Sequence, residues 1–128
     1  MGEKWQSAPV PTAQQLAASY VSGSNLGVRL GEPSRVADSL YLHVIDVDIR
    51  VADQAEDALA ALREVLPVNP DTLPMVRSGS GGASFHLYFV SDKPFRSKML
   101  AHSDGKHRSA DGVWHFDFEC ELFGTGKQ

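Results

Sequence analysis

Three stretches of the chain have the pattern of strands: the first is an apolar run that ends in two aspartates, and the other two alternate between hydrophobic and polar residues throughout. They are Tyr41–Arg50, Ala83–Val90 and Val113–Phe123. Successive side chains of a strand point to opposite faces of its sheet, so residues two apart share a face. The apolar faces are expected to form a core, and the polar faces then place acids, serine and histidine together.

Two further stretches have the periodicity of amphipathic helices. The first begins at Thr12, which forms a capping box with Gln15, and its apolar stripe is predicted to pack in the core. The second ends at Pro67, and Asp53 and Glu56 are its expected capping box. This second helix lies between two strands, which predicts a crossover unit packed on a sheet.

Shorter elements connect these segments. Residues 26–30 are predicted to form a short strand, and Gly31–Ser34 a turn. Met75–Arg77 is expected to pair with the strand that follows it through a glycine-rich connection, Ser78–Gly82. Residues 91–112 are predicted to be a polar loop. Together these elements predict an α/β fold with a mixed, largely antiparallel sheet and helices against it.

Composition narrows the class of protein. A chain of 128 residues is one domain's worth, here a frayed arm at 1–11 and a domain at 12–128. The net charge of −4 excludes a uniformly basic nucleic-acid coat but permits a local basic groove. Cys120 is the single cysteine, which favours a reducing compartment. With no membrane-length apolar run and no signal peptide, a cytoplasmic location is expected.

Asp46 and Asp48 are the first candidates for chemistry. They lie on the same face of their strand, roughly 6–7 Å apart at the rise of a strand. Carboxylates at this spacing can share a hard divalent cation such as Mg²⁺. The alternative is that both are only exposed polar ends of a strand.

The polar faces of the other two strands extend this candidate site if all three strands lie in one sheet. The third strand offers the acids Asp117, Glu119 and Glu121, and the second offers Ser84 and His86. Such a cluster suits two Mg²⁺ or Mn²⁺ ions about 3.5–4 Å apart, because apposed carboxylates without cations repel. The backbone N–H groups of Ser78–Gly82, together with Arg77 or His86, can meet phosphate oxygens.

Four segments, taken in order, resemble the archaeo-eukaryotic primase superfamily, especially the bifunctional primase–polymerase domains of phages, plasmids and mobile elements. They are residues 25–31, residues 44–48, residues 78–89 and residues 121–128. The family pattern is an acid pair two apart, a small-x-His strand, and a hydrophobic residue followed by an acid. The resemblance implies a core like that of RNA-recognition (RRM) domains. It also implies a domain cut short at its C-terminus, because family members continue past the glycine turn.

The resemblance also assigns roles to residues. It implies that Asp46, Asp48 and Glu121 are the catalytic acids and metal ligands, with Glu119 as the fallback for the third. The nucleotide-binding residues that it implies are Ser78, Ser80, Gly81, Gly82, Ser84 and His86. Basic residues that would hold the nucleic-acid backbone are Lys93, Arg96, Lys98, Lys106 and Arg108.

The function implied is template-directed nucleotidyl transfer by a DNA primase/polymerase that uses Mg²⁺ or Mn²⁺ to replicate a mobile element, phage or plasmid. The implied partners are nucleoside triphosphates and DNA template and primer, with a replicative helicase as a candidate and no membrane. Two alternatives stay open: a metal-dependent nuclease, and a catalytically silent module that binds nucleic acid or a replication protein. Glycosyltransferases, which also use Asp-x-Asp, rank last because no half that binds a nucleotide sugar is found.

Overall fold

The computed structural model describes residues 7–24 and 26–127, and its centre is a six-stranded sheet. The strands are β1 (Arg35–Ala37), β2 (Leu40–Ile49), β3 (Met75–Arg77), β4 (Phe85–Ser91), β5 (Lys98–His102) and β8 (Phe118–Phe123). Their order is β3-β4-β2-β8-β5, with β1 paired to β2, and every pairing is antiparallel. The predicted mixed α and β class with a largely antiparallel sheet is confirmed.

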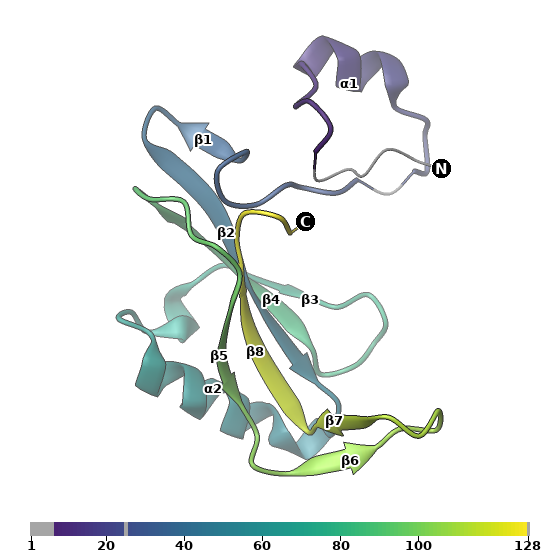
Figure 1. The fold of residues 1–128 in the computed structure, drawn as a ribbon, viewed down its shortest axis with the longest axis vertical. Helices are drawn as coiled ribbons and strands as arrows, with labels where there is room; N and C mark the ends of the chain where they lie inside the picture. The colour runs from purple at the N-terminus through teal and green to yellow at the C-terminus, as the bar shows by residue number, and fades with distance from the viewer. Residues whose placement is uncertain (1–6, 25, 128) are drawn as a thin grey trace.

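The remaining elements lie outside this sheet (Figure 1). They are the helices α1 (Ala13–Ser19) and α2 (Ala55–Val65), the 3₁₀ turns η1 (Ala52–Gln54) and η2 (Pro70–Thr72), and the strands β6 (Lys106–Arg108) and β7 (Trp114–Phe116). The strands β6 and β7 form a separate hairpin, which Figure 1 shows beyond the end of the main sheet. The predicted hairpin of β3 and β4 is confirmed.

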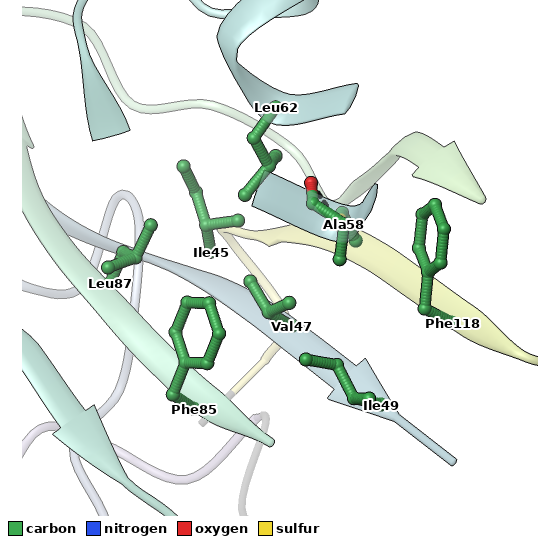
Figure 2. Close-up of a cluster of buried hydrophobic side chains, with 9 residues drawn as sticks. Ile45, Val47, Ile49, Ala58, Leu62, Phe85, Leu87 and Phe118 are labelled. Carbon is green, nitrogen blue, oxygen red and sulfur yellow. Dashed lines mark hydrogen bonds between the residues drawn. The ribbon is translucent and has the colours of Figure 1, made fainter. Parts of the chain in front are cut away.

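The core lies between α2 and one face of the sheet (Figure 2). Ala58 and Leu62, four residues apart on α2, are fully buried against the sheet, as a helix with one apolar face requires. The buried cluster contains Ile45, Val47, Ile49, Ala58, Leu62, Phe85, Leu87, Phe118 and Cys120. The alternate residues of β2, β4 and β8 therefore lie on the opposite face, away from α2.

Each helix departs from one expectation drawn from the sequence. The capping box of Thr12 and Gln15 is present, but the predicted core packing of α1 is wrong, since none of its residues, all described, is buried. Leu16 is 51% exposed. The predicted capping box of Asp53 and Glu56 is also wrong, because η1 leads directly into α2, whose described N-cap residue makes no side-chain hydrogen bond.

Three other segments differ from their predicted structure. In the described part of the chain, residues 26–30 form no strand, and the short strand follows the 31–34 turn as β1. The predicted loop at 91–112 contains β5 and β6. β5 lies at the edge of the sheet and is half exposed, so no buried face marked it as a strand. The predicted last strand is broken at Asp117 into β7 and β8.

The turn at Gly31 joins two distant segments and gives a first prediction. Gly31 has a φ of +73°, and a Cβ at this position would overlap the backbone nitrogen of Thr125. Gly31→Ala is expected to lower the free energy of unfolding by about 2–4 kcal/mol, measured by urea denaturation. Gly23→Ala is the control, because Gly23 also has a positive φ (+87°) but no neighbour within 4 Å. Equal losses in both variants would contradict the predicted overlap.

Candidate functional site

The sheet register brings the candidate residues of three strands together on the face opposite α2. Asp46 on β2 lies between two partners, since it pairs with His86 on β4 and with Glu121 on β8. Asp48 lies opposite Glu119 of β8. These residues alternate with the buried members of the core cluster, so their side chains share the open face.

The residues of the small-x-His strand each contact one of the aspartates. His86 Nε2 lies 3.0 Å from Asp46 Oδ1. The Ser84 hydroxyl donates to Asp48 Oδ1 at 3.2 Å and accepts from the Ile49 N–H at 2.9 Å. Ser84 therefore ties the end of β4 to the second aspartate.

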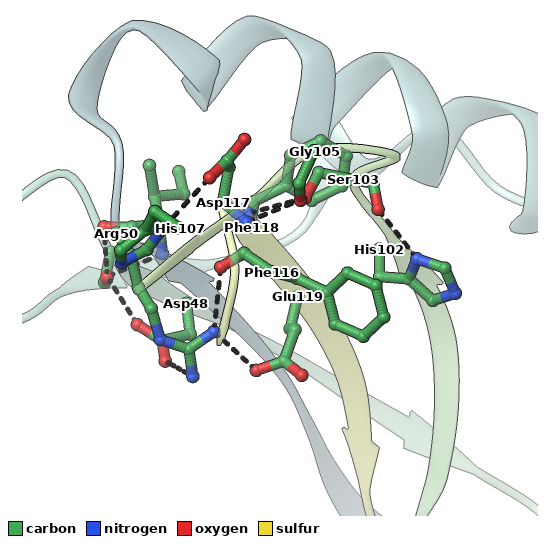
Figure 3. A network of polar contacts seen from close by, with 12 residues as sticks. Asp48, Arg50, His102, Ser103, Gly105, His107, Phe116, Asp117, Phe118 and Glu119 are labelled. Carbon is green, nitrogen blue, oxygen red and sulfur yellow. Dashed lines mark hydrogen bonds and ion pairs between the residues drawn. The ribbon is translucent and has the colours of Figure 1, made fainter. Parts of the chain in front are cut away.

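Two basic residues that the sequence analysis did not select complete the contacts of the acids. Arg50 lies between Asp48 and Glu119 (Figure 3), with N–O distances of 2.7 and 2.6 Å. Lys127 Nζ lies 3.5 Å from Glu121 Oε1. With His86 beside Asp46, each of the four carboxylates has a basic partner within the protein. Arg50 was detectable in the sequence, because it continues the alternation of positions 46 and 48.

Asp117 takes no part in this group, so the prediction that it shares the face of Glu119 is wrong. It lies at the break between β7 and β8, and its carboxylate accepts from His107 Nδ1 at 3.0 Å. Its carbonyl accepts from the backbone N–H groups of Arg50 and Val51, just beyond the last register pair of β2 and β8. Glu121 and Glu119 are therefore the third-strand acids beside the aspartates.

The glycine-rich connection lies at one end of this face. The Ser78 N–H donates to the carbonyl of Ser84, so the connection begins next to the serine that contacts Asp48. The Ser78 and Ser80 hydroxyls lie 2.8 Å apart, and Gly81 has a φ of +78°. Its residues through Gly82 are exposed.

The candidate DNA-contacting residues fall into two exposed groups rather than one loop. Lys93, Arg96 and Lys98 precede or begin β5, while Lys106 and Arg108 lie on β6, beyond its other end. Figure 1 shows these segments at opposite ends of β5. The five residues therefore form two separate groups in the described structure.

A cleft of about 270 Å³ lies beside His86. Its lining residues are Leu26, Gly27, Val28, Leu30, Val44, His86, Tyr88 and Phe123. The segment 26–30 thus forms a wall of this cleft although it is not a strand. Asn25, the first residue of the corresponding sequence motif, lies outside the described residues.

The position of Asp46 between other acids affects its acidity. Burial raises the pKa of Asp46 above its ordinary value, His86 opposes this, and the charges of Asp48 and Glu121 raise the pKa further. Behind it, burial and the Asp46 charge raise the pKa of Cys120 to about 12, which keeps this buried cysteine a neutral thiol.

The raised pKa of Asp46 makes stability depend on pH. Below about 3.8, the ordinary value, the carboxyl is protonated in both folded and unfolded protein. As pH rises from there through the higher folded pKa, the unfolded state ionises more readily, so ionisation of Asp46 lowers the free energy of unfolding. Asp46→Asn has no group to ionise here, so it does not lose this part of the free energy of unfolding. Urea denaturation in EDTA at several pH values should show the variant gaining stability relative to wild type across this window, and a pH-independent difference would contradict it.

The donor chemistry suits a hard cation, although the acids are already paired. In the 7–24 and 26–127 ranges, no three His, Cys, Asp or Glu side chains are arranged to hold a metal ion together. The carboxylate oxygens are nevertheless the donors that Mg²⁺ and Mn²⁺ prefer. Burial first, and then the charges of Asp48 and Glu121, raise the pKa of Asp46, so a cation beside this carboxylate would favour its charged form. The residues therefore fit such an ion if it shares their oxygens with the internal partners or displaces those partners.

Comparison with known proteins identifies the family. The family model described as bifunctional DNA primase/polymerase, N-terminal, matches residues 1–124 of the 128-residue chain. The chain belongs to this family. Membership supports a DNA primase/polymerase function for the domain and confirms the resemblance found in the sequence. Searches of curated proteins and of solved structures returned no match. No helix in the described part of this primase/polymerase domain has the length and apolarity to span a membrane.

Proposed function

We propose that this domain joins nucleotides on a DNA template and that Asp46, Asp48 and Glu121 hold divalent ions for the reaction. The observation that carries the proposal is the register that places Asp46 between His86 and Glu121. When bound, Mg²⁺ or Mn²⁺ stabilises the attacking 3′-oxygen and the leaving pyrophosphate. Glu119, opposite Asp48, is the alternative third ligand.

The neighbours of this acid group suggest how the nucleotide is held. Protonated His86 would donate from its ring to a phosphate oxygen while Asp46 keeps the ring oriented. The cleft beside His86 has the aromatic and aliphatic lining that suits a base and sugar. The N–H groups of the 78–82 connection would meet the triphosphate, since it starts beside Ser84.

The exposed basic residues near the two ends of β5 would hold the DNA backbone. Lys93, Arg96 and Lys98 form one exposed group, and Lys106 and Arg108 form the other. Contacts from both groups would bind phosphates without regard to sequence. On the family resemblance, we place the activity in replication of a mobile element, phage or plasmid, with a replicative helicase as the expected partner.

Incorporation of labelled nucleotides on a primed or unprimed template with Mn²⁺ tests this function directly. We expect product longer than the primer, and separate arms with ribonucleotides and deoxyribonucleotides define the substrate. The same DNA incubated with Mn²⁺ but without nucleotides tests the nuclease alternative, which predicts shortened DNA. DNA binding with neither incorporation nor cleavage would favour a silent binding module and contradict the proposal.

A further inference from the structure

Arg50 is the most heavily engaged basic residue at the acidic face. Its guanidinium contacts Asp48 at 2.7 Å and Glu119 at 2.6 Å, and its side chain is 24% exposed. Asp48 and Glu119 lie directly opposite each other on neighbouring strands, where two like charges repel. The arginine therefore offsets a repulsion that the sheet register builds in.

Additional contacts hold Arg50 in this position (Figure 3). Its Nη1 donates to the carbonyl of Phe116 at 3.2 Å, and its backbone N–H donates to the carbonyl of Asp117 at 2.9 Å. The planar guanidinium presents several donors in a fixed arrangement, which suits simultaneous contact with two carboxylates and a carbonyl. These contacts join the acidic face to the end of the β6–β7 hairpin.

This position has a consequence for any ion that binds Asp48. Asp48 is ion-paired with Arg50 through Oδ2 and accepts a hydrogen bond from the Ser84 hydroxyl through Oδ1, so an ion at Asp48 has to share or displace an existing partner at either oxygen. A divalent ion there also meets the positive charge of the guanidinium at close range. Asp46 and Glu121 have weaker partners. Asp46 contacts the imidazole of His86, at 3.0 Å, and Glu121 lies 3.5 Å from the Lys127 amine.

We propose that Arg50 is a resident cation of this face, which neutralises Asp48 and Glu119 in the metal-free protein and competes with a divalent ion for Asp48. This inference rests on the proposed function, in which Asp48 is a metal ligand. Asp46 and Glu121 would hold an ion first, and Asp48 would join them only when its pair with Arg50 opens. Arg50 thus sets the metal affinity of the site as a positioning residue.

Removing the charge of Arg50 is therefore expected to tighten metal binding, whereas loss of a merely structural residue would weaken it. For Arg50→Gln we expect a Kd for Mn²⁺ about three- to tenfold lower than that of wild type. Arg50→Lys keeps the positive charge but cannot contact both carboxylates in the same way, so its Kd for Mn²⁺ should lie between those of wild type and Arg50→Gln. In EDTA, Arg50→Gln should unfold at lower urea concentration, because Asp48 and Glu119 then repel.

The chain contains a matched control for this substitution. Arg63 also bridges two carboxylates, Glu56 at 2.8 Å and Asp71 at 3.0 Å, and it lies on α2, across the sheet from the acidic face. Arg63→Gln removes a similar pair of contacts and should leave the Kd for Mn²⁺ unchanged.

The test is titration of the full chain with MnCl₂, following free Mn²⁺ by electron paramagnetic resonance, for wild type, Arg50→Gln, Arg50→Lys, Arg63→Gln and Asp46→Asn. Tighter binding by Arg50→Gln than by wild type and Arg63→Gln, with Arg50→Lys intermediate, supports the inference. Binding that is unchanged or weaker in both Arg50 variants overturns it while leaving the metal site in place. Mn²⁺ binding that Asp46→Asn does not reduce refutes the proposed metal site instead. Absence of binding in every variant refutes both.

Discussion

Asp46→Asn is expected to lower the rate of nucleotide incorporation by about a thousandfold while the protein stays folded. Asp46 is the central acid of the group, because it pairs with β4 on one side and β8 on the other. An amide keeps the size of the side chain but removes the charge that holds a cation. Metal ions contribute several kcal/mol to such reactions, and each 1.36 kcal/mol corresponds to a factor of ten in rate.

Stability distinguishes this loss from simple unfolding. Burial and neighbouring acids make the charged form of Asp46 costly in the folded protein, so Asp46→Asn should be at least as stable as wild type in EDTA near neutral pH. Asp38→Asn, in the exposed β1–β2 turn, is the control and should incorporate nucleotides at the wild-type rate. Primer extension measures the rate of nucleotide incorporation, and urea denaturation measures the stability of each variant. A variant that incorporates normally would remove Asp46 from the mechanism.

Leu62→Ala should produce the largest loss of stability that we predict, about 2–5 kcal/mol in the free energy of unfolding. Leu62 is fully buried between α2 and the sheet, so its truncation leaves a cavity in addition to the lost burial. Circular dichroism during urea denaturation provides the measurement. Leu16→Ala makes the same chemical change on α1, where the side chain is 51% exposed, and should cost far less. Similar losses in the two variants would contradict the core described for this fold.

The parts of the fold that the sequence predicted are those with one fully buried face. β4 and the second half of β2, from Ile45 to Ile49, alternate because one face of each belongs to the core shared with α2, and α2 itself shows the matching apolar stripe. The edge strand β5 lacked such a signal, since its residues are at most half buried. α1 carried an apolar stripe of which no residue is buried in the described structure, so periodicity alone misled the prediction of its packing.

The break at Asp117 shows a different limit of sequence reasoning. Polar and apolar residues alternate through this position without interruption, which predicted one long strand. The interruption arises from partners distant in sequence: His107 holds the carboxylate, and the N–H groups of Arg50 and Val51 hold the carbonyl. Contacts of this kind leave no periodic pattern.

In the site, alternation and family resemblance selected the acids and His86, and the register brings them together. They did not select Arg50 or Lys127, because a search for groups that bind a ligand overlooks those that neutralise it in its absence. A search for basic residues on the same strand faces as the acids would have found Arg50.

Diffraction from crystals of the protein soaked with Mn²⁺ and a nucleoside triphosphate, collected for the anomalous signal of manganese, tests the central claim most directly. We predict an anomalous peak within about 2.0–2.2 Å of carboxylate oxygens of both Asp46 and Glu121, with the triphosphate beside His86. Manganese bound elsewhere, with Asp46 still paired only to His86 in the presence of nucleotide, would contradict the account.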